Sequence, residues 1–297
     1  MALQTKVIKQ KIRSIGNVKK VTKTMELISI AKMRKAVAKR LAGLHYGHYI
    51  MELIVRLSAQ QHLEHPLFEE RTSGKRILIL FTSDRGLCGQ YHSRIDRRVR
   101  HFLGNHEGQE IECVAIGKYS LQIAKRYNLP VVYKVSDAVE TLGLDELRKV
   151  AHWVIDSFSM DKTYHSVSCI FNQFESALAF NSVRVKVLPI KEELMSDIYG
   201  TDFIASHDRG KKFSYTVEPD ETSVLNEILP ELFALTLNHF LLESTASEHS
   251  ARMVAMRRAS DNAGRMQNKL IRDYNRARQE AVTKEIIEIV SAAEAMK

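Results

Sequence analysis

The residues best suited to chemistry lie in a loop at residues 82–89, whose sequence is TSDRGLCG. The loop follows an apolar run at 76–81, and the carboxyl end of such a strand is the usual ligand site of an open α/β sheet. It offers a thiol at Cys88 and a carboxylate at Asp84, with His92 close by. It lacks the GxGxxG fingerprint and the lysine of a phosphate-binding loop, and Cys88 has no obvious base in the local sequence. We expect a tight, glycine-dependent turn with a buried Cys88, and keep a small α/β enzyme acting through this loop as an alternative.

The remaining reactive side chains do not suggest an active site. Twelve histidines are scattered along the chain. His45 and His48 could share a helix face, as could His62 and His65, but no further metal ligands lie nearby. The three cysteines are far apart and odd in number, which predicts a reducing compartment without a disulfide framework. We expect no metal, no cofactor and no catalysis by this chain.

The last quarter of the chain must organise the rest. After Pro230 there is no proline, and the only glycine is Gly264. Apolar residues recur at spacings of three and four, typical of a coiled-coil seam, at Ala263, Met266, Leu270, Tyr274, Ala277 and Ala281. A helix of about 70 residues would span roughly 105 Å, whereas a globule of this chain's size is about 50 Å across. Such a helix must protrude and meet a partner.

Residues 3–59 predict a second long helix, of roughly 80 Å. Its apolar positions also recur every three or four residues, at Ile8, Ile12, Ile15, Val18, Val21, Met25 and Ile28. We therefore expect the two terminal helices to pair as an antiparallel two-stranded coiled coil. The alternative, two amphipathic helices wrapped around a globular core, fits their length less well.

Between the helices, short apolar runs alternate with helical segments. We expect strands at 76–81, 110–116, 131–135, 166–174 and 183–190, with helices at 94–103, 118–127 and 145–158. This alternation predicts a Rossmann-like open α/β domain, in which the last two strands could form a hairpin.

The predicted fold class is therefore α/β plus long helices. We expect an N-terminal coiled-coil helix at 1–60, a central α/β domain at 61–205 and a C-terminal coiled-coil helix at 206–297. The connectors at 62–74 and 199–219 are predicted linkers.

The net charge of +9 is carried by the two helices. The first 40 residues hold twelve Lys or Arg against the single acid Glu26, and residues 252–278 hold eight against two acids. A basic coiled-coil protein that binds nucleic acid is therefore the main alternative from another class. However, the basic residues are interleaved with the seam, the two helices must run antiparallel, and the basic face lacks the Asn and aromatic residues that read or stack on bases. The most apolar run, 229–242, is too short to cross a bilayer.

Four segments carry a resemblance to a known family. They are residues 15–36 (IGNVKKVTKTMELISIAKMRKA), 82–89 (TSDRGLCG), 246–263 (ASEHSARMVAMRRASDNA) and 274–290 (YNRARQEAVTKEIIEIV). In content and order they resemble the signature segments of the gamma subunit of rotary F-type ATP synthases. The first begins so close to Met1 that little remains for a cleaved transit peptide, which favours a bacterial form.

The resemblance implies a non-catalytic central shaft. One gamma subunit would lie inside a hexamer of three alpha and three beta subunits. Its foot would contact the epsilon subunit and the membrane ring of c subunits. Rotation would couple ion flow, of H⁺ or Na⁺, to ATP synthesis or hydrolysis at the beta subunits. The chain would be a peripheral protein on the cytoplasmic face of the bacterial inner membrane, with no nucleic acid among its partners.

The resemblance also assigns residues to contacts. Lys23, Met25, Arg278, Gln279 and Thr283 match positions that contact a beta subunit. The apolar residues Ile286, Ile287, Ile289 and Val290 match the tip of the shaft, held in a hydrophobic sleeve. The foot loop contributes Ser83, Asp84, Arg85, Gly86, Cys88 and Gly89.

Some positions depart from the family pattern. The family commonly continues its loop as GLCGGFN, whereas this chain has Gln90, Tyr91 and His92 after Gly89. The basic residues Arg257 and Arg258, and the acidic residue Glu280, stand where many members carry other residue types. The cysteine-bearing insert of the plant plastid form is not evident, so the sequence does not support thiol control.

Overall fold

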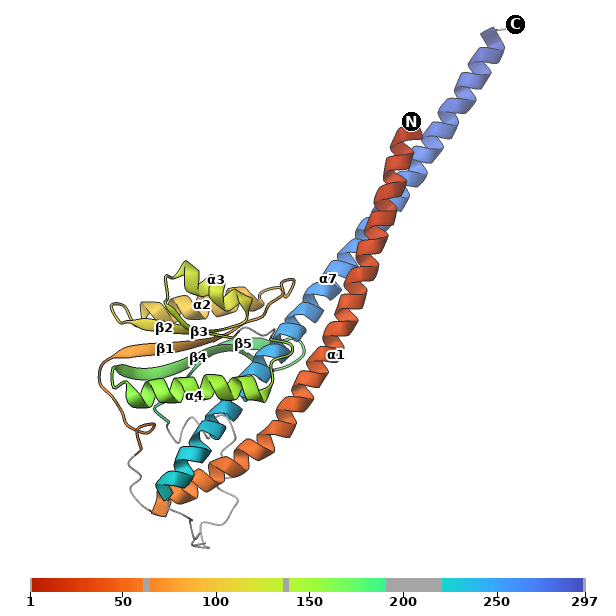
Figure 1. The fold of residues 1–297 in the computed structure, drawn as a ribbon. Coiled ribbons are helices and arrows are strands. Elements are labelled where there is room, and N and C mark those ends of the chain that lie inside the picture. Colours follow the sequence, from red (N-terminus) through yellow and green to blue (C-terminus); the bar gives the residue numbers. More distant parts are fainter. Residues whose placement is uncertain (1, 61–64, 136–138, 191–220, 296–297) are drawn as a thin grey trace. The chain divides into compact units, whose positions relative to one another are not determined.

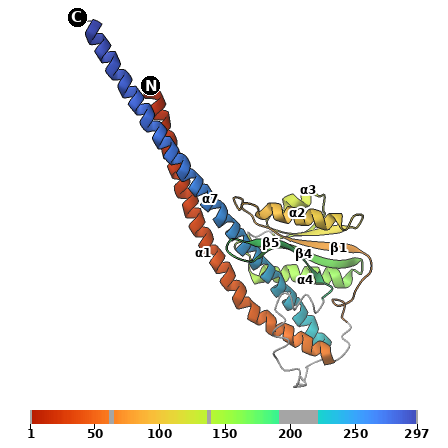
Figure 2. The same ribbon diagram turned by 180° about the vertical axis from the view of Figure 1, so that it is seen from behind.

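The computed structural model describes residues 2–60, 65–135, 139–190 and 221–295. Contacts group the chain into two compact units. The paired-helix unit comprises residues 1–30 and 252–297, and the sheet unit comprises residues 31–251. Two long helices, α1 (Ala2–Gln60) and α7 (Glu221–Ala295), contribute to both units (Figures 1 and 2). The three-part division at residues 60 and 205 stays a prediction.

In the paired-helix unit, α1 and α7 run antiparallel and in close contact (Figure 2). A Cβ added at Gly16 would lie 3.1 Å from the side-chain nitrogen of Gln267, and one added at Gly264 would lie 3.5 Å from Lys19 Nζ. Moving three residues forward along α1 therefore moves three residues back along α7. The predicted antiparallel pairing of the two terminal helices is confirmed.

The α7 side of the seam follows the spacing of a coiled coil. Met256, Ser260 and Ala263 are buried, at 5, 6 and 7% exposure. The half-buried positions that continue the seam are Gln267, Leu270, Tyr274, Ala277 and Ala281. Their intervals of three and four residues keep one narrow face toward α1. The predicted stripe is thus largely correct, but Met266 is 54% exposed and lies outside the seam.

The α1 side of the seam differs from the prediction. Its first residues, Ile8, Ile12 and Ile15, are half-buried as expected. Further along, the buried residues are Thr22, Glu26 and Ser29, while the apolar positions predicted for the seam are exposed at Val18 (48%), Val21 (58%) and Ile28 (50%). We call Val18, Val21, Met25 and Ile28 the outer stripe. An isolated pair of helices gains nothing from exposing these residues.

Polar residues can occupy the seam because their hydrogen bonds are satisfied locally. The Thr22 hydroxyl donates to the Val18 carbonyl at 2.9 Å, and the Ser29 hydroxyl donates to the Met25 carbonyl at 2.7 Å. The Glu26 carboxylate accepts a charged hydrogen bond from Lys23 at 3.0 Å. Because these groups are small or paired, burying them leaves no unsatisfied donor at this part of the helix contact.

The sheet unit contains five strands. They are β1 (Lys75–Phe81), β2 (Ile111–Ile116), β3 (Val131–Lys134), β4 (Tyr164–Phe174) and β5 (Phe180–Leu188), in the order β3-β2-β1-β4-β5. The first four are parallel, and β5 pairs antiparallel with β4. The predicted open α/β domain is confirmed, including the terminal hairpin.

Helices cover both faces of this sheet (Figure 1). They are α2 (Tyr91–Gly104) and α3 (Lys118–Arg126) on one face and α4 (Leu144–Met160) on the other. Ile77 and Ile79 of β1 join the core with α4 and the start of α7, whereas Leu78 and Leu80 join the core with α2 and α3. All four are fully buried. This continuous apolar strand is typical of a sheet covered on both sides.

The first turns of α7 complete the core rather than leave it. Leu225, Leu229 and Leu232 are at most 1% exposed. Pro230 lies inside the helix, beyond its first turn, where it removes the backbone donor that would bond to the Asn226 carbonyl. The predicted helical residues 206–220, the linker at 199–219 and residues 62–64 of the linker predicted at 62–74 lie outside the described residues. Residues 65–74 of that linker contain neither helix nor strand.

Candidate functional site

The loop at residues 82–89 leaves the carboxyl end of β1 and is tied to its surroundings by backbone hydrogen bonds. The Asp84 carboxylate accepts from the Lys118 amide at 2.9 Å and from the Val139 amide at 2.8 Å. Thr82 Oγ1 accepts from the Ser120 amide at 2.8 Å. The Asp84 carboxylate therefore links its own loop to the segments that begin at Lys118 and Val139. Because both of its oxygens are engaged, it is poorly placed to act as a general base.

Ser83 and His92 form a pair that the sequence alone does not reveal. Ser83 Oγ lies 3.2 Å from His92 Nε2, and the His92 ring stacks on Tyr119 at 3.6 Å between centroids. Ser83 is 1% exposed and donates its proton to the Arg85 carbonyl at 3.0 Å. A nucleophilic serine must instead be accessible and give its proton to the base. The pair therefore braces the loop.

The environments of the three cysteines are unfavourable for a nucleophile. Cys88 is 2% exposed, as predicted, and its sulfur lies 3.9 Å from the Arg85 carbonyl. Burial raises the pKa of Cys113 to about 12 and that of Cys169 well above its ordinary value. Thiols kept in the protonated form are poor nucleophiles.

The loop presents two side chains outward. The Arg85 side chain is 72% exposed, with one guanidinium nitrogen 3.9 Å from Glu140, and Leu87 is 64% exposed in a left-handed conformation at φ 61°. Glu140 also accepts from Lys32 Nζ at 2.8 Å to both oxygens, and this hydrogen bond lowers the pKa of Glu140. Arg85 is among the residues predicted from the sequence, whereas Leu87 is not, although its position between two glycines in a turn is a signal for it.

The residues predicted to contact a beta subunit lie on the surface of the paired-helix unit. Met25 is half-buried beside the exposed Lys23 on α1. Arg278, Gln279 and Thr283 are exposed on α7. Among the positions that depart from the family pattern, Arg257 and Arg258 are exposed, and Glu280 pairs with Arg276 at 3.0 Å. Gln90 lies exposed just before α2.

The end of α7 carries an exposed apolar face. Its residues are Val282 (49%), Ile286 (55%), Ile287 (59%), Ile289 (68%) and Val290 (52%). At 3.6 residues per turn, they cover an arc of about 160°. The opposite side carries the ion pair between Lys284 and Glu288 at 3.8 Å. A face this apolar on an exposed helix indicates a docking surface.

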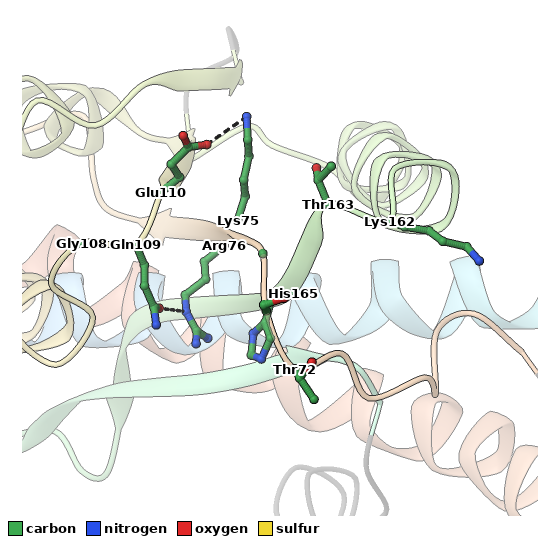
Figure 3. A pocket seen from close by; sticks show the side chains of 11 residues that line it. Thr72, Lys75, Arg76, Gly108, Gln109, Glu110, Lys162, Thr163 and His165 are labelled. Carbon is green, nitrogen blue, oxygen red and sulfur yellow. Dashed lines mark hydrogen bonds and ion pairs between the residues drawn. The ribbon is translucent and has the colours of Figure 1, made fainter.

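A polar hollow of ≈590 Å³ lies at the amino ends of β1 and β4, and Figure 3 shows its lining. Its Lys75 pairs with Glu110 at 3.2 Å and with Glu112 at 3.4 Å, while Arg76 donates to Ser166 at 2.7 Å. Lys75 is thus matched by two carboxylates and Arg76 is held by neutral partners, and the arrangement does not resemble a catalytic site. Within the described ranges, no cluster of three metal-binding side chains occurs. No described helix is both long and apolar enough to span a bilayer.

A family model described as ATP synthase matches residues 4–296. The chain is 34% identical over 297 residues to the ATP synthase gamma chain of Geotalea uraniireducens, covering 98% of each chain, and 34% identical to that of Heliobacterium modesticaldum, covering 97% of this chain and 98% of the relative. Its fold is similar to a chain in the mitochondrial ATP synthase of Euglena gracilis, with a TM-score of 0.65, 16% identity, and coverage of 100% of this chain and 95% of that one. It is also similar to a chain of the Tetrahymena thermophila central stalk and c-ring structure, with a TM-score of 0.56, 21% identity, and coverage of 81% and 99%. The chain therefore belongs to the family of ATP synthase gamma chains, the non-catalytic central-stalk rotor subunits of the F-type enzyme.

Proposed function

We propose that this gamma chain transmits rotation between a ring of c subunits and the catalytic head. One copy would stand within three alpha and three beta subunits, with the sheet unit as a foot that contacts epsilon and the c-ring. The observation that carries the proposal is the surface of the paired-helix unit, where apolar residues are exposed along α1 and at the end of α7. These surfaces have the chemistry of docking faces, and the surrounding basic charge suits an acidic partner.

The rotor would work by favouring different states of otherwise equivalent sites. A rigid element that contacts three beta subunits unequally makes their nucleotide affinities differ, and turning it exchanges those affinities. Two intertwined helices with a fixed register suit this task because they resist bending and slipping. No covalent step falls to the gamma chain.

Two groups of residues carry the proposed contacts with beta. On α1, Lys23 and Met25 face an acidic segment of a beta subunit. On α7, Arg278, Gln279 and Thr283 bind a beta loop. The Arg278 guanidinium can hold a carboxylate bidentately, and its exposure leaves it accessible to a partner.

The apolar end of α7 would turn inside a hydrophobic sleeve. Ile286, Ile287, Ile289 and Val290 form this tip, and enclosing them would remove their exposed apolar area from water. The loop at 82–89, as part of the foot, would contact a partner subunit through its outward residues, Arg85 and Leu87. Ser83, Asp84, Gly86, Cys88 and Gly89 would hold the loop's shape.

We place the complex on the cytoplasmic face of a bacterial inner membrane. The full-length matches to bacterial gamma chains support this location. The gamma chain would be a peripheral component held there by the membrane sector.

The contact assignment is tested with the double variant Arg278→Ala/Gln279→Ala. We expect a lower ATPase rate of the assembled head and unchanged helicity of the isolated chain. Arg276→Ala is the matched control, since it removes a nearby arginine that pairs with Glu280 within α7. Turnover equal to that of the unmodified head would refute the assignment. Salt-dependent retention on DNA, without affinity for an alpha–beta hexamer, would instead favour the nucleic-acid alternative.

A further inference from the structure

A second hollow, of ≈500 Å³, lies between α2 and the edge strand β5. Its lining includes Arg94, Arg97, Arg98 and His101 from α2, and Asn181 and Ser182 from β5. Among the described residues that line it, none carries a carboxylate. Three guanidinium groups thus share one small concave surface with hydroxyl and amide groups.

Two of these arginines are held in place by neutral partners. The Arg94 guanidinium lies 4.6 Å from the centre of the Phe180 ring and donates to the Phe180 carbonyl. Arg98 Nε donates to the Ser182 carbonyl at 2.8 Å. Each guanidinium has five N–H donors, so these bonds leave several donors for a ligand. Carbonyl oxygens fix the side chains but do not neutralise their charge.

The surroundings add positive charge rather than cancel it. The α2 carboxylate Asp96 is engaged by Arg126 at 2.7 Å and by Arg100 at 3.7 Å. Across the described residues, no ion pair joins a carboxylate to Arg94, Arg97 or Arg98.

The next residues of β5 that face α2 are also basic. Arg184 lies over the Phe102 ring of α2 at 5.6 Å. Burial and then the charge of Arg184 lower the pKa of Arg76. Burial, followed by the charges of Arg76 and Lys186, lowers the pKa of His165. This side of the sheet therefore gathers several basic side chains.

The contrast with the hollow of Figure 3 shows why this one suits an anion. There, Lys75 is matched by both Glu110 and Glu112. In the hollow beside α2, three arginines have no such partner among the described residues. An anion placed there would gain charge-assisted hydrogen bonds without displacing a carboxylate.

We propose that the hollow between α2 and β5 binds a phosphoryl group, either as free phosphate or as the headgroup of an anionic phospholipid. A phosphoryl group has up to two negative charges and several acceptor oxygens, so it can engage more than one guanidinium at once. A single carboxylate would satisfy one arginine fork and leave the others unmatched. The prior fixation of Arg94 and Arg98 reduces the side-chain entropy lost on binding.

Substitution of Arg97 distinguishes ligand binding from a purely structural role of the arginines. Arg94 and Arg98 would hold the edge of β5 even without a ligand. Arg97 is exposed, lines the hollow between them, and has no hydrogen bond or ion pair with another described residue. Replacing it therefore tests binding without loosening β5.

The experiment measures binding of inorganic phosphate to the full chain by calorimetry, and flotation with phosphatidylcholine vesicles that contain or lack phosphatidic acid. The test variant is Arg97→Gln. The control is Arg100→Gln, which makes the same charge change on the same helix but removes an arginine paired with Asp96. Thermal melting of both variants checks that they fold.

We expect saturable binding that Arg97→Gln weakens about tenfold and Arg100→Gln changes by less than about twofold. Binding of phosphate in solution identifies the free anion as the ligand, whereas binding only to phosphatidic acid vesicles identifies the lipid headgroup. Absence of saturable binding in both assays would overturn the proposal. Equal weakening by the two variants would also overturn it, because it would reveal only a general effect of charge.

Discussion

Arg40 on α1 forms an ion pair with Glu243 on α7, 203 residues later in the chain. The Glu243 side chain is 2% exposed, and its second carboxylate oxygen accepts a hydrogen bond from the Phe174 amide at 2.6 Å. One buried carboxylate thus joins both long helices to β4 within the sheet unit. The loss of either partner would leave a charge in a poorly solvated place.

We expect Glu243→Gln to destabilise the chain by about 3 kcal/mol, because the Arg40 charge then lacks its counter-charge. Urea unfolding followed by circular dichroism measures this change. Glu280→Gln, which alters an exposed pair with Arg276, should change the unfolding free energy by less than about 0.5 kcal/mol. Similar effects of the two substitutions would show that the buried pair is not a structural joint.

Protonation of the buried His239 should destabilise the chain in mild acid. Burial and then the nearby Arg40 charge lower the pKa of His239 to about 4. A Glu243 carboxylate oxygen lies 3.7 Å from His239 Nε2, but this carboxylate is already engaged by Arg40 and the Phe174 amide. Burial therefore has the larger effect on the pKa of His239. The pKa of His239 in the folded chain lies below the value of about 6.5 expected in the unfolded chain. Neutral His239 therefore contributes fully to the free energy of unfolding above about pH 6.5, and this contribution is lost as the pH falls toward 4.

From pH 7 to pH 5 the contribution of His239 should fall by about 2 kcal/mol. Urea unfolding at both pH values measures the loss. In His239→Gln this component of the pH dependence should disappear, while other titrating groups contribute equally to both proteins. An identical pH dependence in the two proteins would contradict the assignment.

Gly117 fixes the junction between β2 and α3. Its φ is +89°, and an added Cβ would lie 2.7 Å from the Thr82 carbonyl oxygen. Gly117→Ala should therefore cost more than about 2 kcal/mol of stability. Gly104→Ala is the matched control, since nothing lies within 4 Å of an added Cβ there. Equal stability of the two variants in thermal melting would show that the junction relaxes without cost.

Substitutions in the outer stripe should weaken assembly with the hexamer without changing the stability of the isolated chain. Ile28→Ser should change the unfolding free energy by less than about 0.5 kcal/mol, because Ile28 is 50% exposed in the isolated chain. It should nevertheless weaken association with an alpha–beta hexamer by about 1 to 2 kcal/mol through lost apolar burial. Leu27→Ser changes a residue of similar exposure, 56%, outside the outer stripe and should affect assembly less. Equal assembly of both variants, measured by size-exclusion chromatography, would argue against this face as the contact.

The long helices and the alternating sheet were predictable because their signals are local. Helix-forming composition, with Pro230 as the only proline in either helix, predicts α1 and α7, and apolar runs with intervening helical segments predict the sheet. The seam of α1 was not predictable by counting apolar residues. Val21 and Ile28 follow the helical period as well as Thr22 and Ser29 do, and a helix with more than one partner has more than one apolar stripe. Single-sequence periodicity cannot assign a stripe to a partner.

The loop at 82–89 likewise has features that its local sequence predicts and features that depend on distant segments. Its glycines predict a tight turn, and the turn with buried Cys88 is observed. The roles of Ser83 and Asp84 depend on partners in other segments, such as His92 and the Val139 amide, which only the folded sheet brings together. The contacts of Arg278 and Gln279 depend on another protein, so they stay predictions.

Reconstitution of the catalytic head decides whether this chain is its rotor. This chain is mixed with separately prepared alpha and beta subunits, and the size of the complex and its MgATP hydrolysis are followed together. We expect a complex with one copy of this chain per alpha–beta hexamer and a strongly raised turnover. If the chain stays apart from the hexamer and leaves its rate unchanged, it is not the shaft of that head.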